Sequence, residues 1–269
     1  MRRSLSYSRG FTLTELAVVF TIVALLLGGA IYTLSAQTDQ RMIADTQKRL
    51  EDAKEMLLAY AVVNGRLPCP AAAPPYTPYS NGTATAVGLE SPSGGLACTD
   101  GYTGFLPGRT LGMQGTDSFG YVMDAWNNPI RYAVSKTGSN RYTTQHTTAA
   151  PWSLSSTPAD LQVCSLSSAG AACPAASTVT AANVVVAVVW SQGKNFRPLA
   201  TGGIGVGGGS ADELANNKHR LPSVQHDDGA FVSRPPSQSG STAGEFDDYV
   251  AWIPVGVLYN RMLAAGVLP

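Results

Sequence analysis

The sequence predicts an α+β protein in which one long N-terminal helix precedes an antiparallel β-sheet with long loops. Two observations lead to this class. Residues 11 to 64 combine an apolar run with an amphipathic pattern and contain no proline, which is typical of a continuous helix. Three later segments are rich in β-branched and aromatic residues and are bounded by turn residues, which is typical of strands.

The composition limits the class of protein. The chain has 269 residues, of which 44% are apolar and 13% are charged, and this apolar share is sufficient for a folded core. Its 28 glycines and 17 prolines indicate long loops. Lysine and arginine number 18, and so do aspartate and glutamate, so no basic excess is present to neutralise the phosphates of a nucleic acid.

The first helical segment, residues 11–38, is long and apolar enough to cross a bilayer, since about 20 apolar residues span the hydrocarbon layer. Three arginines precede it, Arg2, Arg3 and Arg9, and they place the N-terminus in the cytoplasm by the positive-inside rule. The only charge inside the segment is Glu15. A carboxylate at that depth predicts either a side chain that reaches the headgroups or a functional pairing with a cation.

The second helical segment, residues 39–65, is amphipathic. Its apolar residues repeat at helical spacing at Leu50, Ala53 and Leu57, so one face is expected to pack on an exported domain. Asn64-Gly65 predicts the end of the helix.

Beyond the helix, residues 66–120 are predicted to be a long connecting region, because glycine, proline, serine and threonine dominate there. Strands are expected at residues 129–135, 183–191 and 248–253. The second of these is apolar on both faces and is therefore expected to be central in the sheet. Residues 255–265 predict a terminal helix with four side chains facing inward: Val257, Leu258, Met262 and Leu263.

Four cysteines lie in the region expected outside the cytoplasm, where disulfides are favoured over thiols. Four cysteines allow three pairings, and proximity in sequence favours Cys69–Cys98 and Cys164–Cys173. A zinc site is the alternative, but the spacings contain no C-x-x-C pattern.

The N-terminal segment Arg9-Gly10-Phe11-Thr12-Leu13-Thr14-Glu15, followed by the apolar run, resembles the leader signal of type IV pilins and type II secretion pseudopilins. The resemblance implies that a prepilin peptidase cuts between Gly10 and Phe11 and N-methylates Phe11. It also implies that Glu15 pairs with the terminal amine of an adjacent subunit. The expected organisation is then a leader at 1–10, a membrane and filament-core helix at 11–38, an amphipathic helix at 39–65 and an exported domain at 66–269.

Two further segments extend the resemblance. Residues 124–132, DAWNNPIRY, are similar to a D-x-W-G-x-P segment of pseudopilin-like proteins, with Asn127 where glycine is usual. Residues 245–250, EFDDYV, are similar to a late F-D-D segment of prepilin-like sequences.

Calcium is the cofactor that the resemblance suggests, because pseudopilins of the major type hold it in a late loop. Four aspartates are the candidate ligands: Asp227, Asp228, Asp247 and Asp248. No D-x-D-x-D-G spacing appears, so a solvated acidic loop without any cofactor is the alternative reading.

Signals for an enzyme are weak. Residues 203–208 match the pattern G-x-G-x-x-G, but they do not lie between a strand and a helix of a βαβ unit. Ser191 and Lys194 match the pattern S-x-x-K, but the S-D-N and K-T-G motifs that accompany it in enzymes are not found with it. The histidines, His146, His219 and His226, are dispersed. The chain is therefore predicted to be a structural protein and no enzyme.

The predicted function is that of a prepilin processed to a minor subunit of a type IV pilus. Its expected partners are the prepilin peptidase, other pilin subunits, an inner-membrane assembly platform and membrane lipid, with the C-terminal domain in the periplasm before assembly. The alternatives are a type II secretion pseudopilin and, from another class, a filament-displayed adhesin or DNA-uptake module. A basic stripe around Arg131, Lys136, Arg141, Lys194 and Arg197 would favour DNA.

Overall fold

The computed structural model describes residues 11–72, 88–92, 94, 97–99, 101–147, 152, 157–167, 173–174, 176–196, 210–218 and 228–268, with side chains at 29–35 not described. The chain divides into two compact units, residues 1–44 and 45–269. The described elements are therefore considered unit by unit.

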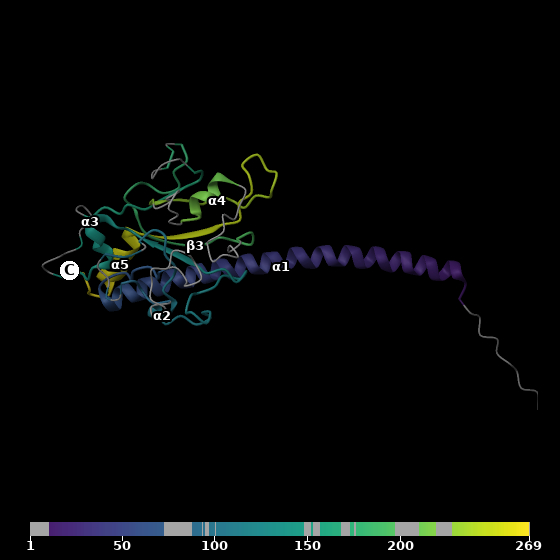
Figure 1. Ribbon diagram of the computed structural model, residues 1–269, viewed down its shortest axis with the longest axis horizontal. Helices are drawn as coiled ribbons and strands as arrows, with labels where there is room; N and C mark the ends of the chain where they lie inside the picture. The colour runs from purple at the N-terminus through teal and green to yellow at the C-terminus, as the bar shows by residue number, and fades with distance from the viewer. Residues whose placement is uncertain are drawn as a thin grey trace, which may run out of the picture. The chain divides into compact units, whose positions relative to one another are not determined.

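The first helix, α1, runs over Leu13–Asn64 and contributes to both units (Figure 1). Its end is where the sequence predicts it. Gly65 has a φ of 67°, and its N–H donates to the carbonyl of Ala61 at 2.8 Å, which closes the last turn. In the second unit, the predicted apolar face of α1 is buried at Leu50, Ala53 and Leu57.

Three antiparallel strands form the main sheet in the order β1-β3-β5. Their bounds are Arg131–Val134, Val185–Ser191 and Tyr249–Pro254. The register places Ala133 opposite Val188, and Val188 opposite Trp252. All seven residues of β3 are buried, so its prediction as the central strand is confirmed.

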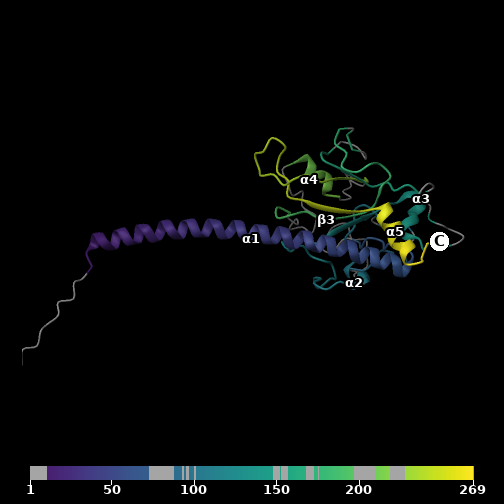
Figure 2. The same cartoon turned by 180° about the vertical axis from the view of Figure 1, so that it is seen from behind.

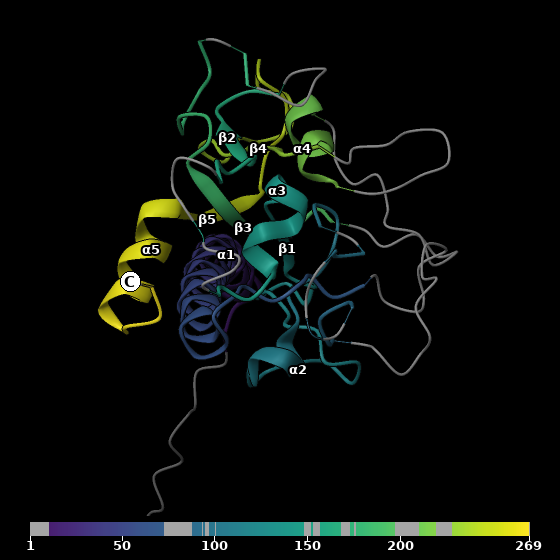
Figure 3. The same cartoon turned by 90° about the vertical axis from the view of Figure 1, so that its left-hand side faces the viewer.

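Two short strands that the sequence did not predict form a second sheet. β2, Gln162–Cys164, and β4, Ala230–Val232, pair in parallel. Figure 3 shows this pair and α4, Ala211–Asn216, on one side of the main sheet, and the C-terminal part of α1 on the other. In Figure 2, which views the molecule from behind Figure 1, α4 lies above β3 and α1 lies below it. The core between the sheets contains Ala133, Leu161, Val163, Val185, Val188, Trp190 and Phe231.

The remaining helices are short. α2 is Gly108–Leu111, α3 is Thr137–Asn140, followed by a 3-10 turn at Arg141–Thr143, and α5 is Val255–Ala264. In α5, the expected burial is confirmed at Leu258 and Met262 but is wrong at Val257 and Leu263, which are 42% and 46% exposed. The helix buries a narrower stripe than its composition suggests, because only one face of it meets the rest of the unit.

The structure pairs Cys69 with Cys98 and Cys164 with Cys173, as proximity in sequence predicts. The first bond ties the segment that follows α1 to the loop around Glu90. The second joins Cys164, the last residue of β2, to a cysteine nine positions later.

Candidate functional site

The start of α1 has a reciprocal pair of hydrogen bonds between Thr12 and Glu15. The Glu15 N–H donates to Thr12 Oγ1 at 3.3 Å, and the Thr12 N–H donates to Glu15 Oε2 at 2.9 Å. The Thr12 hydroxyl also donates to the same carboxylate oxygen at 2.9 Å. This is a capping box, which satisfies two backbone N–H groups that a helix start leaves open. The capping box was not predicted above, although the pattern T-x-x-E before an apolar run indicates it.

The capping box makes a prediction about the helix start. Thr12→Ala removes the side-chain acceptor for the Glu15 N–H, so we expect the first turn of α1 to lose about 1 kcal/mol of stability. Hydrogen exchange at the amides of residues 13 to 15 measures this loss. Thr21→Ala is the matched control, because the Thr21 hydroxyl donates to Ala17 O inside the helix and caps nothing. Equal exchange in both variants would contradict the capping role.

Large apolar side chains along the first turns of α1 are exposed. Phe11 is 87% exposed and Leu13 is 86% exposed, and the same holds for Leu16, Val18, Val19, Phe20, Ile22, Val23, Leu25, Leu26 and Leu27. A contiguous apolar surface of this extent marks an interaction with lipid or with other chains.

Among the described side chains, no helix combines the length and the apolar character that a bilayer span requires. The span expected at residues 11–38 is therefore not confirmed, and it includes residues 29–35, whose side chains lie outside the description. Gly10, the expected residue before the cleavage site, also lies outside the described residues.

A buried ion pair fixes the end of α1 to the loop that follows it. Arg66 donates from Nη1 to Glu90 Oε2 at 2.8 Å and from Nη2 to Glu90 Oε1 at 2.7 Å. The N–H groups of Cys69 and Gly94 and the Tyr60 hydroxyl donate to the same carboxylate. Burial of Glu90 favours its protonated form, but the hydrogen bonds from Arg66, Gly94 and Cys69 outweigh this, so the pKa of Glu90 is lowered.

The DAWNNP segment is a turn organised by Asp124. Asp124 Oδ1 accepts from the N–H groups of Trp126 at 2.9 Å and Asn128 at 2.8 Å, and Oδ2 accepts from the Ser191 hydroxyl at 2.5 Å. Burial raises the pKa of Asp124 despite these bonds. Asn127 has a φ of 66°, a backbone conformation that asparagine tolerates and glycine favours. This explains why Asn127 stands where glycine is usual.

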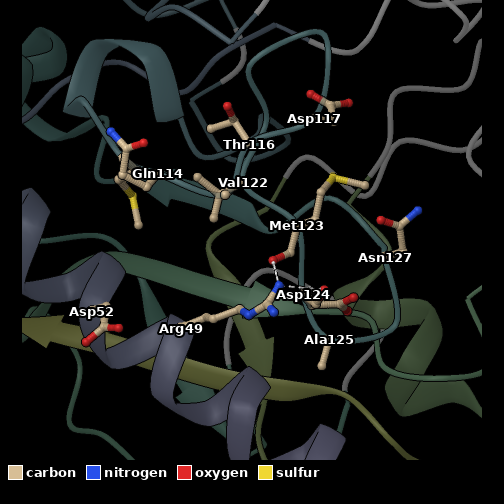
Figure 4. A pocket seen from close by; sticks show the side chains of 12 residues that line it. Arg49, Asp52, Gln114, Thr116, Asp117, Val122, Met123, Asp124, Ala125 and Asn127 are labelled. Atoms are coloured by element: carbon tan, nitrogen blue, oxygen red, sulfur yellow. Dashed lines mark hydrogen bonds between the residues drawn. The ribbon is translucent and has the colours of Figure 1, made fainter.

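A cavity of about 650 Å³ opens between α1 and the loop at 113–127 (Figure 4). At its floor, Arg49 donates to the carbonyls of Met123 at 2.8 Å and Asp124 at 2.9 Å. Figure 4 shows Asp52 and Asp117 on opposite walls. Among the described lining residues, Thr116 supplies a hydroxyl and Asp52, Asp117 and Asp124 supply carboxylates, and none is a histidine, cysteine, serine or lysine.

The candidate calcium ligands do not converge. Asp228 pairs with Lys218, Asp248 accepts from Asn216 Nδ2 at 2.9 Å, and Asp247 accepts from two backbone N–H groups. Asp227 lies outside the described residues. Within the described part of the chain, no group of three or more histidine, cysteine, aspartate or glutamate side chains is placed to hold a metal ion.

Glu213 is a buried carboxyl beside Asp247. Its Oε1 accepts from Asn195 Nδ2 at 3.1 Å and from the Asp247 N–H at 3.1 Å. Its Oε2 is buried and has no hydrogen-bond partner among the described residues. Burial, with the negative charges of Asp247 and Glu245, raises the pKa of Glu213 to about 6.

This pKa predicts a pH dependence of stability. A carboxyl whose pKa is higher in the folded state than its ordinary value of 4.5 stabilises the fold below pH 4.5. The stabilisation is lost as the pH rises through about 6. We expect Glu213→Gln to reduce the fall in the free energy of unfolding over this interval by about 1 kcal/mol. Urea unfolding at several pH values measures it, with the exposed Glu55→Gln as the control. Parallel pH profiles for all three proteins would contradict the prediction.

The structure also places the residues of the possible basic stripe, the S-x-x-K pattern and the histidines, as far as they are described. Arg131 is fully buried, with its guanidinium 4.9 Å from the Phe105 ring and 5.3 Å from the Trp190 ring, so it cannot contribute to a basic surface stripe. The Ser191 hydroxyl is bonded to Asp124 rather than to Lys194. Three other candidates lie outside the described residues: His219, His226 and the glycine-rich segment at 203–208. His146 is described, and its Nδ1 accepts a hydrogen bond from the backbone N–H of Trp152.

Residues 5–31 match the family model described as the prokaryotic N-terminal methylation motif. This motif is the one found in type IV pilins and pseudopilins, so the resemblance of the N-terminal segment is confirmed. No curated protein and no solved structure is significantly similar to the chain.

Proposed function

We propose that this chain, which carries the prokaryotic N-terminal methylation motif, is a prepilin processed to a minor structural subunit of a type IV pilus. In this proposal a peptidase removes residues 1–10 and methylates Phe11. The helix at 11–38 is held in the inner membrane before assembly and in the filament core afterwards, while the domain at 66–269 is exported.

The observation that carries the proposal is the exposed apolar surface at the start of α1, directly behind the motif. Its eleven large apolar side chains, from Phe11 to Leu27, are exposed among the residues that the structure describes. Burial in lipid or among like helices removes this surface from water. Each Å² of apolar surface buried contributes about 25 cal/mol of favourable free energy. A structural subunit uses the same surface twice, first in the membrane and then in the filament.

The position of Glu15 supports assembly through charge pairing. It lies on the first turn of α1, four residues after Phe11, whose amine becomes free on cleavage. In an apolar helix bundle a carboxylate is stable only when a cation compensates it. The terminal amine of a neighbouring subunit supplies that cation in the proposed filament and fixes the register between helices.

The competing assignment within the same class is a type II secretion pseudopilin, since the motif is shared by both systems. A basic stripe that would favour a DNA-uptake module gains no support, because Arg131, one of its five residues, is buried. We propose no enzymatic activity for the chain.

Mass spectrometry of the N-terminal peptide tests the proposal, with the sheared surface fraction and the cell envelope analysed separately. N-methylated Phe11 in sheared filaments is the expected result. The same terminus confined to the envelope would assign the chain to a pseudopilus. An intact Met1 in both fractions would refute processing and with it the filament subunit.

Gly10→Val tests the cleavage site itself. The peptidase needs close access to the backbone before Phe11, and a β-branched side chain at this position obstructs it. We expect the unprocessed chain to accumulate, with a mass increase equal to the leader peptide on immunoblots and in intact-mass spectra. Ser8→Val is the matched control two residues upstream, and normal processing of Gly10→Val would place the cleavage site elsewhere.

A further inference from the structure

We infer that Asp228, Asp247 and Asp248 are held by donors of this chain, with the Lys218 ammonium as the internal cation beside Asp228, so that the fold does not require calcium. The inference concerns the described residues Asp228, Asp247 and Asp248. It is independent of filament assembly.

Lys218 lies where a cation is needed. Its side chain is fully buried, and its ammonium contacts Asp228 Oδ1 and donates to the carbonyl of Ala230 at 2.5 Å. The ammonium also lies 4.8 Å from the centre of the Phe231 ring, which favours a cation over its face. The Ala230 N–H donates to the same Asp228 oxygen at 3.0 Å. A carboxylate, a carbonyl and an aromatic ring thus surround one positive charge supplied by the chain.

Asp248 is held by a side chain that is itself fixed. Asn216 Nδ2 donates to Asp248 Oδ2 at 2.9 Å and to the carbonyl of Val232 at 2.8 Å. Asn216 Oδ1 accepts from the Val232 N–H at 2.7 Å. The amide therefore bridges α4, β4 and the start of β5. Asp248 is 6% exposed, so little room is left beside it for a hydrated ion.

Asp247 has its own donors. Its Oδ2 accepts from the N–H groups of Lys194 at 2.8 Å and Asn195 at 2.9 Å. Its Oδ1 lies beside Gly193, where an added Cβ would be 2.5 Å from that oxygen, and it has no hydrogen-bond partner among the described residues. The donors of Asp247 are thus backbone groups of the segment after β3, separate from those of Asp228 and Asp248.

These arrangements are unlike a calcium site. Calcium takes six to eight oxygen ligands that point to one centre. Here the three carboxylates bond to three separate donor groups, namely an ammonium, an amide and a pair of backbone N–H groups. A calcium ion would have to replace donors that already bond to Asp228 Oδ1, Asp247 Oδ2 and Asp248 Oδ2.

Thermal unfolding of the full chain in detergent tests the inference, in EDTA, in millimolar calcium chloride and in millimolar magnesium chloride. We expect the same Tm in all three solutions. A Tm that rises in calcium but not in magnesium, and that EDTA returns to its starting value, would overturn the inference.

Lys218→Met tests the internal cation separately, because it leaves Asp228 without its charge partner. We expect a fall in Tm of about 6–12 °C that calcium does not reverse. Lys48→Met, at an exposed position on α1, is the matched control and is expected to change Tm by less than about 2 °C. If Lys218→Met does not fold, Asp228→Asn serves as the milder variant with the same expected direction. An unchanged Tm in the variant that folds would overturn the role of Lys218.

Discussion

Glu90→Gln is expected to lower the free energy of unfolding by about 3–5 kcal/mol, because it leaves the Arg66 guanidinium buried without a compensating charge. The side chains of Arg66 and Glu90 are only 10% and 8% exposed. Glu90 also accepts hydrogen bonds from the Cys69 and Gly94 N–H groups, and glutamine can replace only part of this set. Urea unfolding of the full chain in detergent measures the loss.

The matched control is Glu51→Gln. Glu51 pairs with Lys54 at 2.8 Å on an exposed face of α1, where its side chain is 62% exposed. A surface pair of this kind contributes less than about 1 kcal/mol. Losses of similar size in the two variants would show that the Arg66–Glu90 pair is no stronger than a surface pair.

The same pair predicts an acid sensitivity. The pKa of Glu90 is lower in the folded state than its ordinary value of 4.5, so its contribution is complete above pH 4.5 and is lost as the pH falls through the folded value. We expect the stability difference between the wild type and Glu90→Gln to shrink on acidification below pH 4.5. This direction is opposite to that expected for Glu213, so the two carboxyls can be separated by their pH profiles.

Glu15→Gln is expected to abolish incorporation into filaments while leaving membrane insertion intact. Glutamine keeps an acceptor oxygen at the third helical position and so preserves the capping box with Thr12. It removes the charge that would pair with the Phe11 amine of a neighbouring subunit. Quantitative immunoblots of the sheared and envelope fractions measure incorporation and insertion separately.

Glu15→Val removes both the cap and the charge, and comparison of the two variants separates these roles. If charge pairing drives assembly, both variants stay in the envelope. If Glu15→Gln assembles normally and Glu15→Val does not, the glutamate acts as a helix cap and the pairing account is wrong. Thr12→Ala, which removes the cap from the other side, is then expected to behave like Glu15→Val.

Much of the fold could be predicted because it depends on local patterns. The long helix α1 follows from residues 11 to 64 without proline, and its end follows from Asn64-Gly65. The three strands of the main sheet follow from short β-branched runs, and β3 is central because it is apolar on both faces. Each disulfide joins two cysteines that follow one another in the order of the four cysteines, at separations of 29 and 9 residues. The motif at the N-terminus is likewise a local pattern and identifies the proposed processing site.

The remaining features depend on contacts between residues that are distant in sequence. The bond between Arg66 and Glu90 joins residues 24 positions apart, and the sequence around neither residue identifies the other. Contacts between distant residues also decide three other features: the parallel pairing of β2 with β4, the burial of Arg131, and the exposure of Val257 and Leu263. The family resemblance suggests calcium at the late carboxylates, whereas the fold bonds Asp228, Asp247 and Asp248 to separate donor groups of the chain.

The sequence by itself determined the helix, the main strands and the methylation motif, because each is encoded by neighbouring residues along the chain. The tertiary structure alone decided which charges are buried and what compensates them. Burial of a charged side chain costs free energy unless a partner is near, and that partner is set by the packing of α1, α4 and the two sheets. Lys218, Asn216 and Arg66 acquire their roles only in the folded chain.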